Sequence, residues 1–180
     1  MAQYDIARIP TQNTPHPIPS RTTHMNAIDK LGLSTALSKA RKSYQEGGIP
    51  IGSALVYHGC SSSSLDAAIV LGCAHNQRIQ KSSPTLHAEI ATLEDAGRLK
   101  ADVYRGSTMV SVPCNMCTGA ILLYKIPRVV IGENENWVGG EALLKQHGVE
   151  VIVLDDPECK DLMKRFIQEK PEEWNEDIGE

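Results

Sequence analysis

Two segments decide how this 180-residue chain is interpreted: Thr85-Leu86-His87-Ala88-Glu89 and Pro113-Cys114-Asn115-Met116-Cys117. They are separated by about the length of one helix, one loop and one strand. One histidine and two cysteines can hold a tetrahedral zinc ion while its fourth position stays open for water. A structural site with four protein ligands lacks that open position. The sequence therefore predicts a catalytic zinc site made by His87, Cys114 and Cys117.

Both segments are expected to open helices. His87 and Glu89 fall in the first turn of one predicted helix, and Cys114 and Cys117 fall at the start of the next. Helix N-termini present free N–H groups and a positive dipole end, which favour thiolates. Residues two apart on a helix diverge by about 200°, so Glu89 need not join the ligands. We expect it to hydrogen-bond the zinc-bound water, whose pKa zinc lowers to about 7, and to shuttle protons.

A Cys-x-x-Cys pair by itself is not specific to catalytic zinc. It could be a redox pair or half of a zinc ribbon. A ribbon needs a second cysteine pair, which the sequence lacks, and a redox pair has no need of a His-x-Glu partner. The combination, with Pro113 before the first cysteine, is the signature of zinc deaminases that act on nucleobases.

The composition is compatible with this chemistry. A chain of 180 residues with 41% hydrophobic content suits one domain with its own core. The net charge of -4, without a Lys/Arg cluster, argues against a nucleic-acid partner and favours a small substrate. No apolar run approaches the roughly 20 residues of a membrane span, and no secretory signal begins the chain, so we expect no membrane association. A cytoplasmic location follows, with the nucleus left open.

Five cysteines, an odd number, count against a disulfide framework. Outside the two segments, Cys60, Cys73 and Cys159 lack ligand spacing and are expected to be small structural or incidental residues. Only Cys114 and Cys117 are spaced as ligands.

The order of the expected elements indicates an α/β fold. Residues 1–24, rich in proline, are expected to form a flexible N-terminal arm, and residues 25–180 a single zinc-dependent deaminase domain. Helix patterns cover 26–44, 86–99, 115–124, 141–147 and 157–169, and strand patterns cover 51–57, 67–74, 108–112, 128–131 and 150–154. The first two strands form a hairpin around a serine-rich loop at 59–64. This alternation is typical of helices layered on one sheet.

The chain resembles the fungal cytosine deaminases of the cytidine deaminase-like superfamily over about residues 27–180. The resemblance rests on Glu46–Gly52, His75-Asn76, Thr85–Glu89, Pro113–Ala120, Gly132–Asn134 and the terminal Glu176–Glu180. It implies a three-layer α/β/α sandwich with a central mixed five-stranded sheet. It also implies a homodimer that binds Zn²⁺ and converts cytosine to uracil and ammonia.

The resemblance also implies roles for individual residues. His87, Cys114 and Cys117 match the zinc ligands, and Glu89 matches the proton shuttle. Other positions match groups around the pyrimidine: the side chains of Asn76 and Asp177, the backbone of Ala88 and Cys114, and the apolar Trp174, Trp137 and Ile51. We expect Val112, in the segment beside the zinc ligands, to border the same pocket.

One segment departs from the family pattern. Where the family usually carries Leu-Ser-Pro-Cys-Asp, this chain has Ser111-Val112-Pro113-Cys114-Asn115. The strand before it, taken from Val103, is about two residues shorter than expected. A deletion of two residues preserves the alternation of side chains along a strand but moves the point where it bends towards the zinc.

Three interpretations stay open. The chain could be a cytosine deaminase, with 5-substituted cytosines among the bases to test. It could deaminate a different amino-heterocycle in an altered pocket. It could also be a zinc-stabilised dimeric scaffold without catalysis, although Glu89 counts against this because a structural site has no need of it. The position of Asp177 near the chain end further suggests a C-terminal segment that closes as a lid.

Overall fold

The structure is a computed structural model that describes residues 25–59 and 68–180. The predicted N-terminal arm and most of the hairpin loop, including Cys60, lie outside these ranges. Five strands form one sheet in the order β2-β1-β3-β4-β5. Their bounds are β1 Gly52–Tyr57, β2 Ile69–His75, β3 Ser107–Val110, β4 Arg128–Ile131 and β5 Glu150–Val153. β1 pairs antiparallel with β2 and β3, whereas β3, β4 and β5 run parallel, so the predicted mixed sheet is confirmed.

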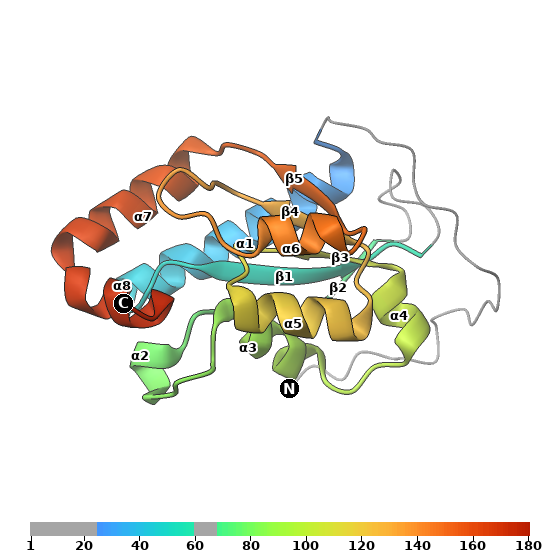
Figure 1. Cartoon of the computed structure of the whole chain (residues 1–180), viewed down its shortest axis with the longest axis horizontal. Coiled ribbons are helices and arrows are strands. Elements are labelled where there is room, and N and C mark those ends of the chain that lie inside the picture. Colours follow the sequence, from blue (N-terminus) through green and yellow to red (C-terminus); the bar gives the residue numbers. More distant parts are fainter. Residues whose placement is uncertain (1–24, 60–67) are drawn as a thin grey trace.

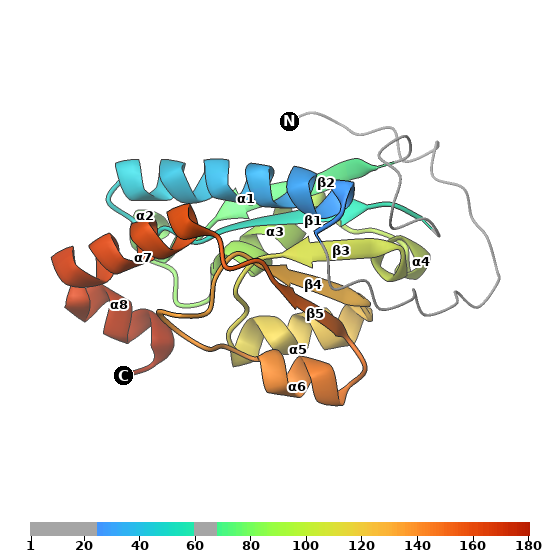
Figure 2. The ribbon, with the colours of Figure 1, turned by 90° about the horizontal axis from the view of Figure 1, so that it is seen from above.

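Helices cover both faces of the sheet. α1 (Ala27–Gln45) and α7 (Pro157–Glu169) lie on one side, and α3 (Ala88–Ala96), α5 (Asn115–Tyr124) and α6 (Glu141–Gln146) lie on the other (Figures 1 and 2). The predicted three-layer α/β/α arrangement is therefore confirmed. Three short helices complete the described chain: α2 (Arg78–Lys81), α4 (Ala101–Arg105) and α8 (Pro171–Ile178). Within the described ranges, no helix combines the length and apolar character that crossing a bilayer requires.

Two glycines let helix backbones lie directly on the sheet. A Cβ atom on Gly52 of β1 would collide with the carbonyl oxygen of Ala36 in α1. A Cβ atom on Gly72 of β2 would collide with the carbonyl oxygen of Thr92 in α3. Because each helix packs directly against the backbone of a strand, these contacts fix the distance of α1 and of α3 from the sheet, on its two opposite faces. The N-terminus of α3, where His87 lies, is placed by this contact.

Strand alternation divides the core into two layers. Leu55, Met109 and Val129 point towards α5 and belong to the larger buried cluster. On the opposite face, Ala54 packs with the start of α1, and Val110 packs with Ala36 in its middle. Burying one face of each strand against α1 and the other against α5 fixes the strand register, because a slip of one residue would exchange the faces.

The strand predicted at 108–112 is present as β3, but the view that this strand runs from Val103 is wrong. β3 begins at Ser107, and Val103 lies in α4. The run of Val103 and Tyr104 looks like a strand, but both side chains reach the core from one face of a short helix. Tyr104 stacks on Tyr124 of α5 with ring centroids 4.5 Å apart. Tertiary burial here outweighs the local β-propensity.

The other differences concern helix ends and short helices. α3 begins and ends within the predicted 86–99, and periodicity predicts neither α2 nor α8. α2 is only one turn long and α8 only two, so neither offers enough sequence for a reliable pattern. Cys73 and Cys159 lie on β2 and α7 as free thiols.

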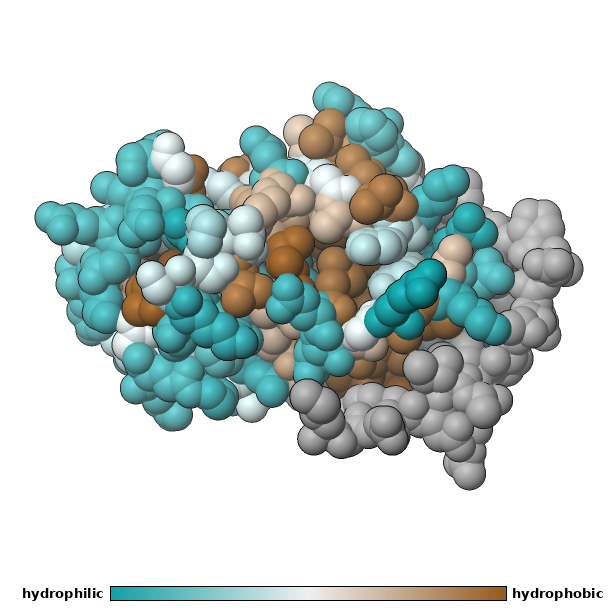
Figure 3. All heavy atoms as spheres, turned by 90° about the horizontal axis from the view of Figure 1, so that it is seen from below, coloured by the Kyte–Doolittle hydropathy of each residue, from teal (hydrophilic) through white to brown (hydrophobic). Residues whose placement is uncertain are grey.

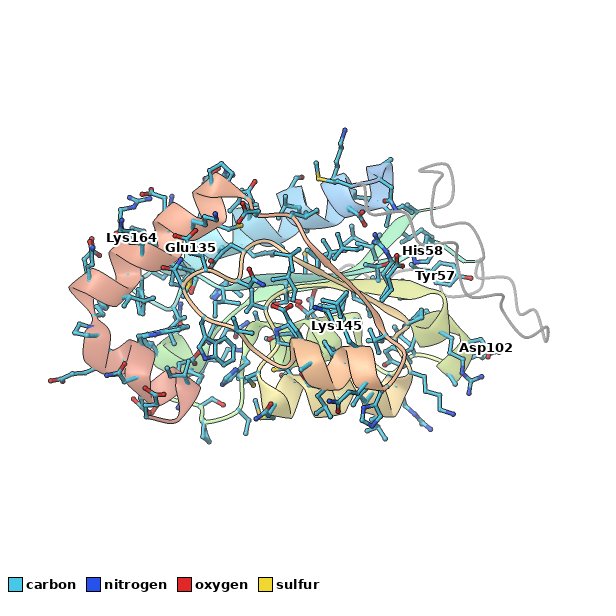
Figure 4. The ribbon with its side chains drawn as sticks, turned by 45° about the horizontal axis from the view of Figure 1, so that its top comes forward. Tyr57, His58, Asp102, Glu135, Lys145 and Lys164 are labelled. Atoms are coloured by element: carbon cyan, nitrogen blue, oxygen red, sulfur yellow. The ribbon has the colours of Figure 1, made fainter. Side chains whose placement is uncertain are left out.

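A buried ion pair joins α1 to the sheet at the end opposite α8. Arg128 is 3% exposed and donates through Nη1 and Nη2 to both carboxylate oxygens of Asp29, and through Nε to Glu150 at 2.9 Å. His58 bonds Thr108 at 3.0 Å in the same region, and burial, with the charge of Arg128, lowers its pKa. Figure 4 shows His58 at the end of β1 away from α8. Buried ion pairs of Arg128 with Asp29 and Glu150 therefore link α1, β4 and β5 at this end of the sheet.

We expect Asp29→Ala to lower the free energy of unfolding by roughly 3–5 kcal/mol, because it leaves the buried Arg128 guanidinium without its main partner. Urea denaturation followed by circular dichroism measures the loss. Asp102→Ala is the matched control: it breaks an exposed 3.1 Å pair with Arg105 and should cost about 1 kcal/mol or less. Equal losses in the two variants would contradict the structural importance of the buried pair.

Candidate active site

The structure brings the predicted ligand residues together. The ligand atoms of His87, Cys114 and Cys117 all lie within 4.8 Å of one another, close enough for a single metal ion. His87 Nδ1 lies 3.5 Å from Cys114 Sγ. One imidazole and two thiols form a donor set that suits zinc. The predicted grouping is therefore present in the fold.

The starts of two helices hold these side chains. His87 is the N-cap of α3, and its carbonyl accepts a hydrogen bond from Ala91 N at 2.9 Å. Cys114 is the N-cap of α5, and its carbonyl accepts from Thr118 N at 2.8 Å. Neither side chain caps its helix, so both remain available as ligands. The first N–H groups of each helix have no partner within the helix and can donate to a ligand.

A hydrogen bond joins the side chains of Cys114 and Cys117. The hydrogen bond from Cys117 lowers the pKa of the Cys114 thiol to about 4 and raises the pKa of Cys117. The hydrogen bond thus favours the thiolate form of Cys114 over that of Cys117. Metal binding needs both sulfurs deprotonated, so it displaces the remaining proton.

The two ring nitrogens of His87 face different groups. Nδ1 faces Cys114, whereas Nε2 lies 3.6 Å from Asp177 Oδ1. Burial lowers the pKa of His87, but the hydrogen bond to Cys114 and the charge of Asp177 outweigh it and leave the pKa above its usual value. A carboxylate behind a ligating histidine orients the ring and fixes which nitrogen meets the metal.

Glu89 is a buried carboxylate beside the donor set. It is 1% exposed, and its Oε1 has no hydrogen-bond partner among the described residues. Burial raises its pKa to about 7. An unpaired buried polar atom is costly and is uncommon in folded proteins. A carboxylate in this state can accept and release a proton near neutral pH, and water or substrate would supply the missing partner.

Asn76 is held firmly by its backbone and side chain. Its N–H donates to Ile51 O at 2.8 Å, and its carbonyl accepts from Ser43 Oγ at 3.2 Å and from His75 Nδ1 at 2.8 Å. Its Nδ2 donates to Asp177 Oδ1 at 3.0 Å. Two residues predicted to read the base, 101 positions apart, are thus in direct contact.

An apolar cavity of about 50 Å³ is lined by residues of α1, β1, β3, α7 and α8, and none of the donor residues, Asn76 or Asp177 lines it. Ile51, Val112, Trp137 and Trp174 all line it. The two indole rings meet edge to face, with centroids 6.2 Å apart at 89°. All four predicted apolar residues therefore line one cavity.

Sequence reasoning missed Arg78. The first residue of α2 contacts both Asn76 and Asp177. It also missed the roles of Ser43 and His75, which hold the Asn76 carbonyl. The only signal was position: His75 precedes and Arg78 closely follows a residue expected to touch the base.

A model of the cytidine and deoxycytidylate deaminase zinc-binding region matches residues 26–133, which include His87, Glu89, Cys114 and Cys117. The chain belongs to this zinc-dependent deaminase family. It is therefore a hydrolytic enzyme with a zinc cofactor, as the sequence predicts.

Individual relatives agree with this membership. The chain is 56% identical to a cytosine deaminase of Candida albicans over 87% of this chain and all of that protein. It is 33% identical to a tRNA-specific adenosine deaminase of Haemophilus influenzae, over 81% of this chain and 87% of that protein. A solved tRNA:A34 deaminase that edits the wobble position matches with a TM-score of 0.58 and 25% identity, covering 74% of this chain and 99% of that one.

We expect the purified protein to carry about one zinc ion per chain and Cys117→Ala to lose most of it, because only two protein ligands would remain. Metal analysis after dialysis against a mild chelator measures this. Cys159→Ala, which removes a thiol from α7, should keep its zinc. Full zinc occupancy in the Cys117 variant would place the metal elsewhere.

Proposed function

We propose that the protein deaminates cytosine hydrolytically to uracil and ammonia, with zinc held by His87, Cys114 and Cys117. The observation that carries this proposal is the buried carboxylate of Glu89 beside the three donors, with its Oε1 unpaired among the described residues. Zinc, when bound, activates water for attack on C4 of the base. The 56% identity to a cytosine deaminase supports the choice of base.

Glu89 moves the protons of the reaction. It accepts a proton from the attacking water and places it on ring nitrogen N3. It then moves the proton of the new hydroxyl group to the amino group at C4, which leaves as ammonia. A raised pKa suits a carboxyl group that must both accept and donate at neutral pH.

Base recognition comes from groups around the donors. Asn76 offers an amide and Asp177 a carboxylate to the polar edge of the ring. The backbone N–H groups of Ala88 and Cys114, at the starts of α3 and α5, can stabilise negative charge that develops on the substrate. Trp137 and Trp174 lie beside the apolar cavity and would cover the ring faces. This combination suits a flat heterocycle with one polar edge.

We expect Glu89→Gln to lower kcat on cytosine by at least roughly 10²- to 10⁴-fold while zinc stays bound, because the amide cannot shuttle protons. Ammonia release from cytosine, 5-methylcytosine, adenine and guanine measures turnover and base choice together. Glu94→Gln, on the same helix but exposed, should keep full activity. Turnover of a purine but not of cytosine would favour a different amino-heterocycle as substrate, and inactivity of the zinc-loaded wild type on every base would favour a scaffold.

The proposed assembly is a homodimer formed through the outer face of α5. Met116 and Leu123 are exposed on this helix, Leu123 to 72%, and Val138 and Leu143 lie exposed in the neighbouring segment. Figure 3 shows apolar side chains gathered across the middle of this face. Contiguous exposed apolar surface marks an interaction site.

Gly119 supports a close approach by another helix. It lies in the middle of α5, and a Cβ atom there would meet nothing within 4 Å. A glycine inside a helix costs about 0.5–1 kcal/mol relative to alanine, so nothing within the described chain favours it. A helix of a second copy packed closely against position 119 would favour glycine there, because a larger side chain would collide with it. Because α5 begins next to Cys114, such an interface would also support the metal site from outside.

We expect Leu123→Asp to convert the dimer into a monomer, because it buries a charge in an apolar interface. Analytical ultracentrifugation measures the mass. Gly119→Gln should also weaken the dimer although it improves helix propensity, which separates assembly from folding. Ile69→Asp, at an exposed apolar position on β2, is the matched control and should stay dimeric. A dimer in both α5 variants would exclude this face.

A further inference from the structure

Arg78 lies where the two base-reading residues meet. It is the first residue of α2, and its side chain is 13% exposed. Its backbone N–H donates to Asn76 Oδ1 at 3.0 Å, and its Nη1 donates to Asp177 Oδ1 at 3.1 Å. Arg78 therefore contacts both residues, one through its backbone and one through its guanidinium.

These contacts determine how Asn76 is turned. The Arg78 N–H can pair only with the amide oxygen of Asn76, and Asp177 can accept only from the amide nitrogen. The two side-chain ends are thus distinguished, and the amide cannot flip without losing both bonds. Asn76 is presented to the base in a single orientation.

Three donors converge on the same oxygen of Asp177. Asn76 Nδ2, Arg78 Nη1 and His87 Nε2 lie 3.0, 3.1 and 3.6 Å from Oδ1. None of these three contacts uses Oδ2. An arrangement that saturates one carboxylate oxygen leaves the other to receive a hydrogen bond from a ligand. The same oxygen also faces the ring of a predicted zinc ligand.

The charge of Arg78 matters because Asp177 is buried. The Asp177 side chain is only 3% exposed, so an unpaired carboxylate there would be strongly disfavoured. Arg78 supplies the cation that balances it. Its Nη2 also reaches Glu176 at 3.2 Å, but that side chain is 75% exposed and its contribution is small. The contact to Asp177 is the buried ion pair that joins α8 to α2, beside the apolar packing of Trp174 against Ile49 and Phe166.

We propose that Arg78 is a positioning residue that holds Asp177 by Oδ1, so that Oδ2 is presented to the base and α8 stays docked against α2 and α3. This rests on the proposed function for the role of Asp177 towards the base. Arg78 itself touches neither the reacting atoms nor the metal donors. Its effect passes through Asp177 and Asn76.

Steady-state kinetics of Arg78→Gln and Arg78→Lys test this role. We expect Arg78→Gln to raise KM by roughly 10- to 100-fold with kcat changed by less than about 3-fold, because a hydrogen bond to a charged group is lost from base binding rather than from the chemical step. Arg78→Lys should give an intermediate KM, because lysine keeps the charge but lacks the planar fork. Zinc content should remain at the wild-type level in both.

A double-mutant cycle with Asp177→Asn separates positioning from general destabilisation. If Arg78 acts through Asp177, the double variant should have the KM of Asp177→Asn alone, within about 2-fold. Multiplicative effects of the two changes would overturn the proposal. So would a fall in kcat with KM unchanged.

Two control variants remove comparable surface charges. Arg41→Gln breaks a bridge between α1 and α7, and Glu176→Gln removes the exposed partner of Arg78. Both should change KM by less than about 2-fold, because exposed ion pairs contribute little. Equal effects of Arg41→Gln and Arg78→Gln would overturn the proposal, because any loss of a helix-joining arginine would then suffice.

The wild type tests the proposed function separately. If it turns over another base instead of cytosine, the KM ratios are measured on that base. Hydrogen exchange provides a readout that needs no substrate: amides of α8 should exchange faster in Arg78→Gln than in Arg41→Gln. Unchanged exchange in α8 would contradict the docking role whatever the substrate.

Discussion

The site depends on two helices that begin at the same edge of one sheet. α3 starts at His87 and α5 starts at Cys114, and only their common origin brings an imidazole and two sulfurs within reach of one ion. The close contact of α3 with Gly72 sets the first position. The parallel pairing of β3 with β4, on either side of α5 in the sequence, sets the second. A shift of either helix by one turn would separate the donors.

The polar half of the site comes from the far end of the chain. Asp177 reaches back from α8 to Asn76, Arg78 and His87, so one buried carboxylate contacts both a predicted zinc ligand and a residue proposed to bind the base. The other buried charge cluster, Asp29 with Arg128, lies at the opposite end of the sheet. Stability and chemistry thus use separate buried charges.

The features that could be predicted from the sequence are those set by residues close together in the chain. His-x-Glu and Cys-x-x-Cys are local patterns, and the strand at 128–131 is a short apolar run whose residues are all buried in the structure. Contacts between residues far apart in the sequence are not marked by any local pattern. The assignment of Asn76 and Asp177 to one site came only from the family resemblance, their direct contact was not predicted, and no sequence pattern pointed to Arg78. Val103 was misplaced because its burial is decided by packing against α5 and not by its neighbours.

Zinc K-edge X-ray absorption of the purified protein examines the metal centre itself, on which the proposed chemistry depends. We expect two sulfur ligands at about 2.3 Å, one imidazole nitrogen at about 2.0–2.1 Å and one further light atom in the open position. A four-sulfur shell, a shell without sulfur, or a protein that binds no zinc would contradict the assignment of His87, Cys114 and Cys117 as the ligands.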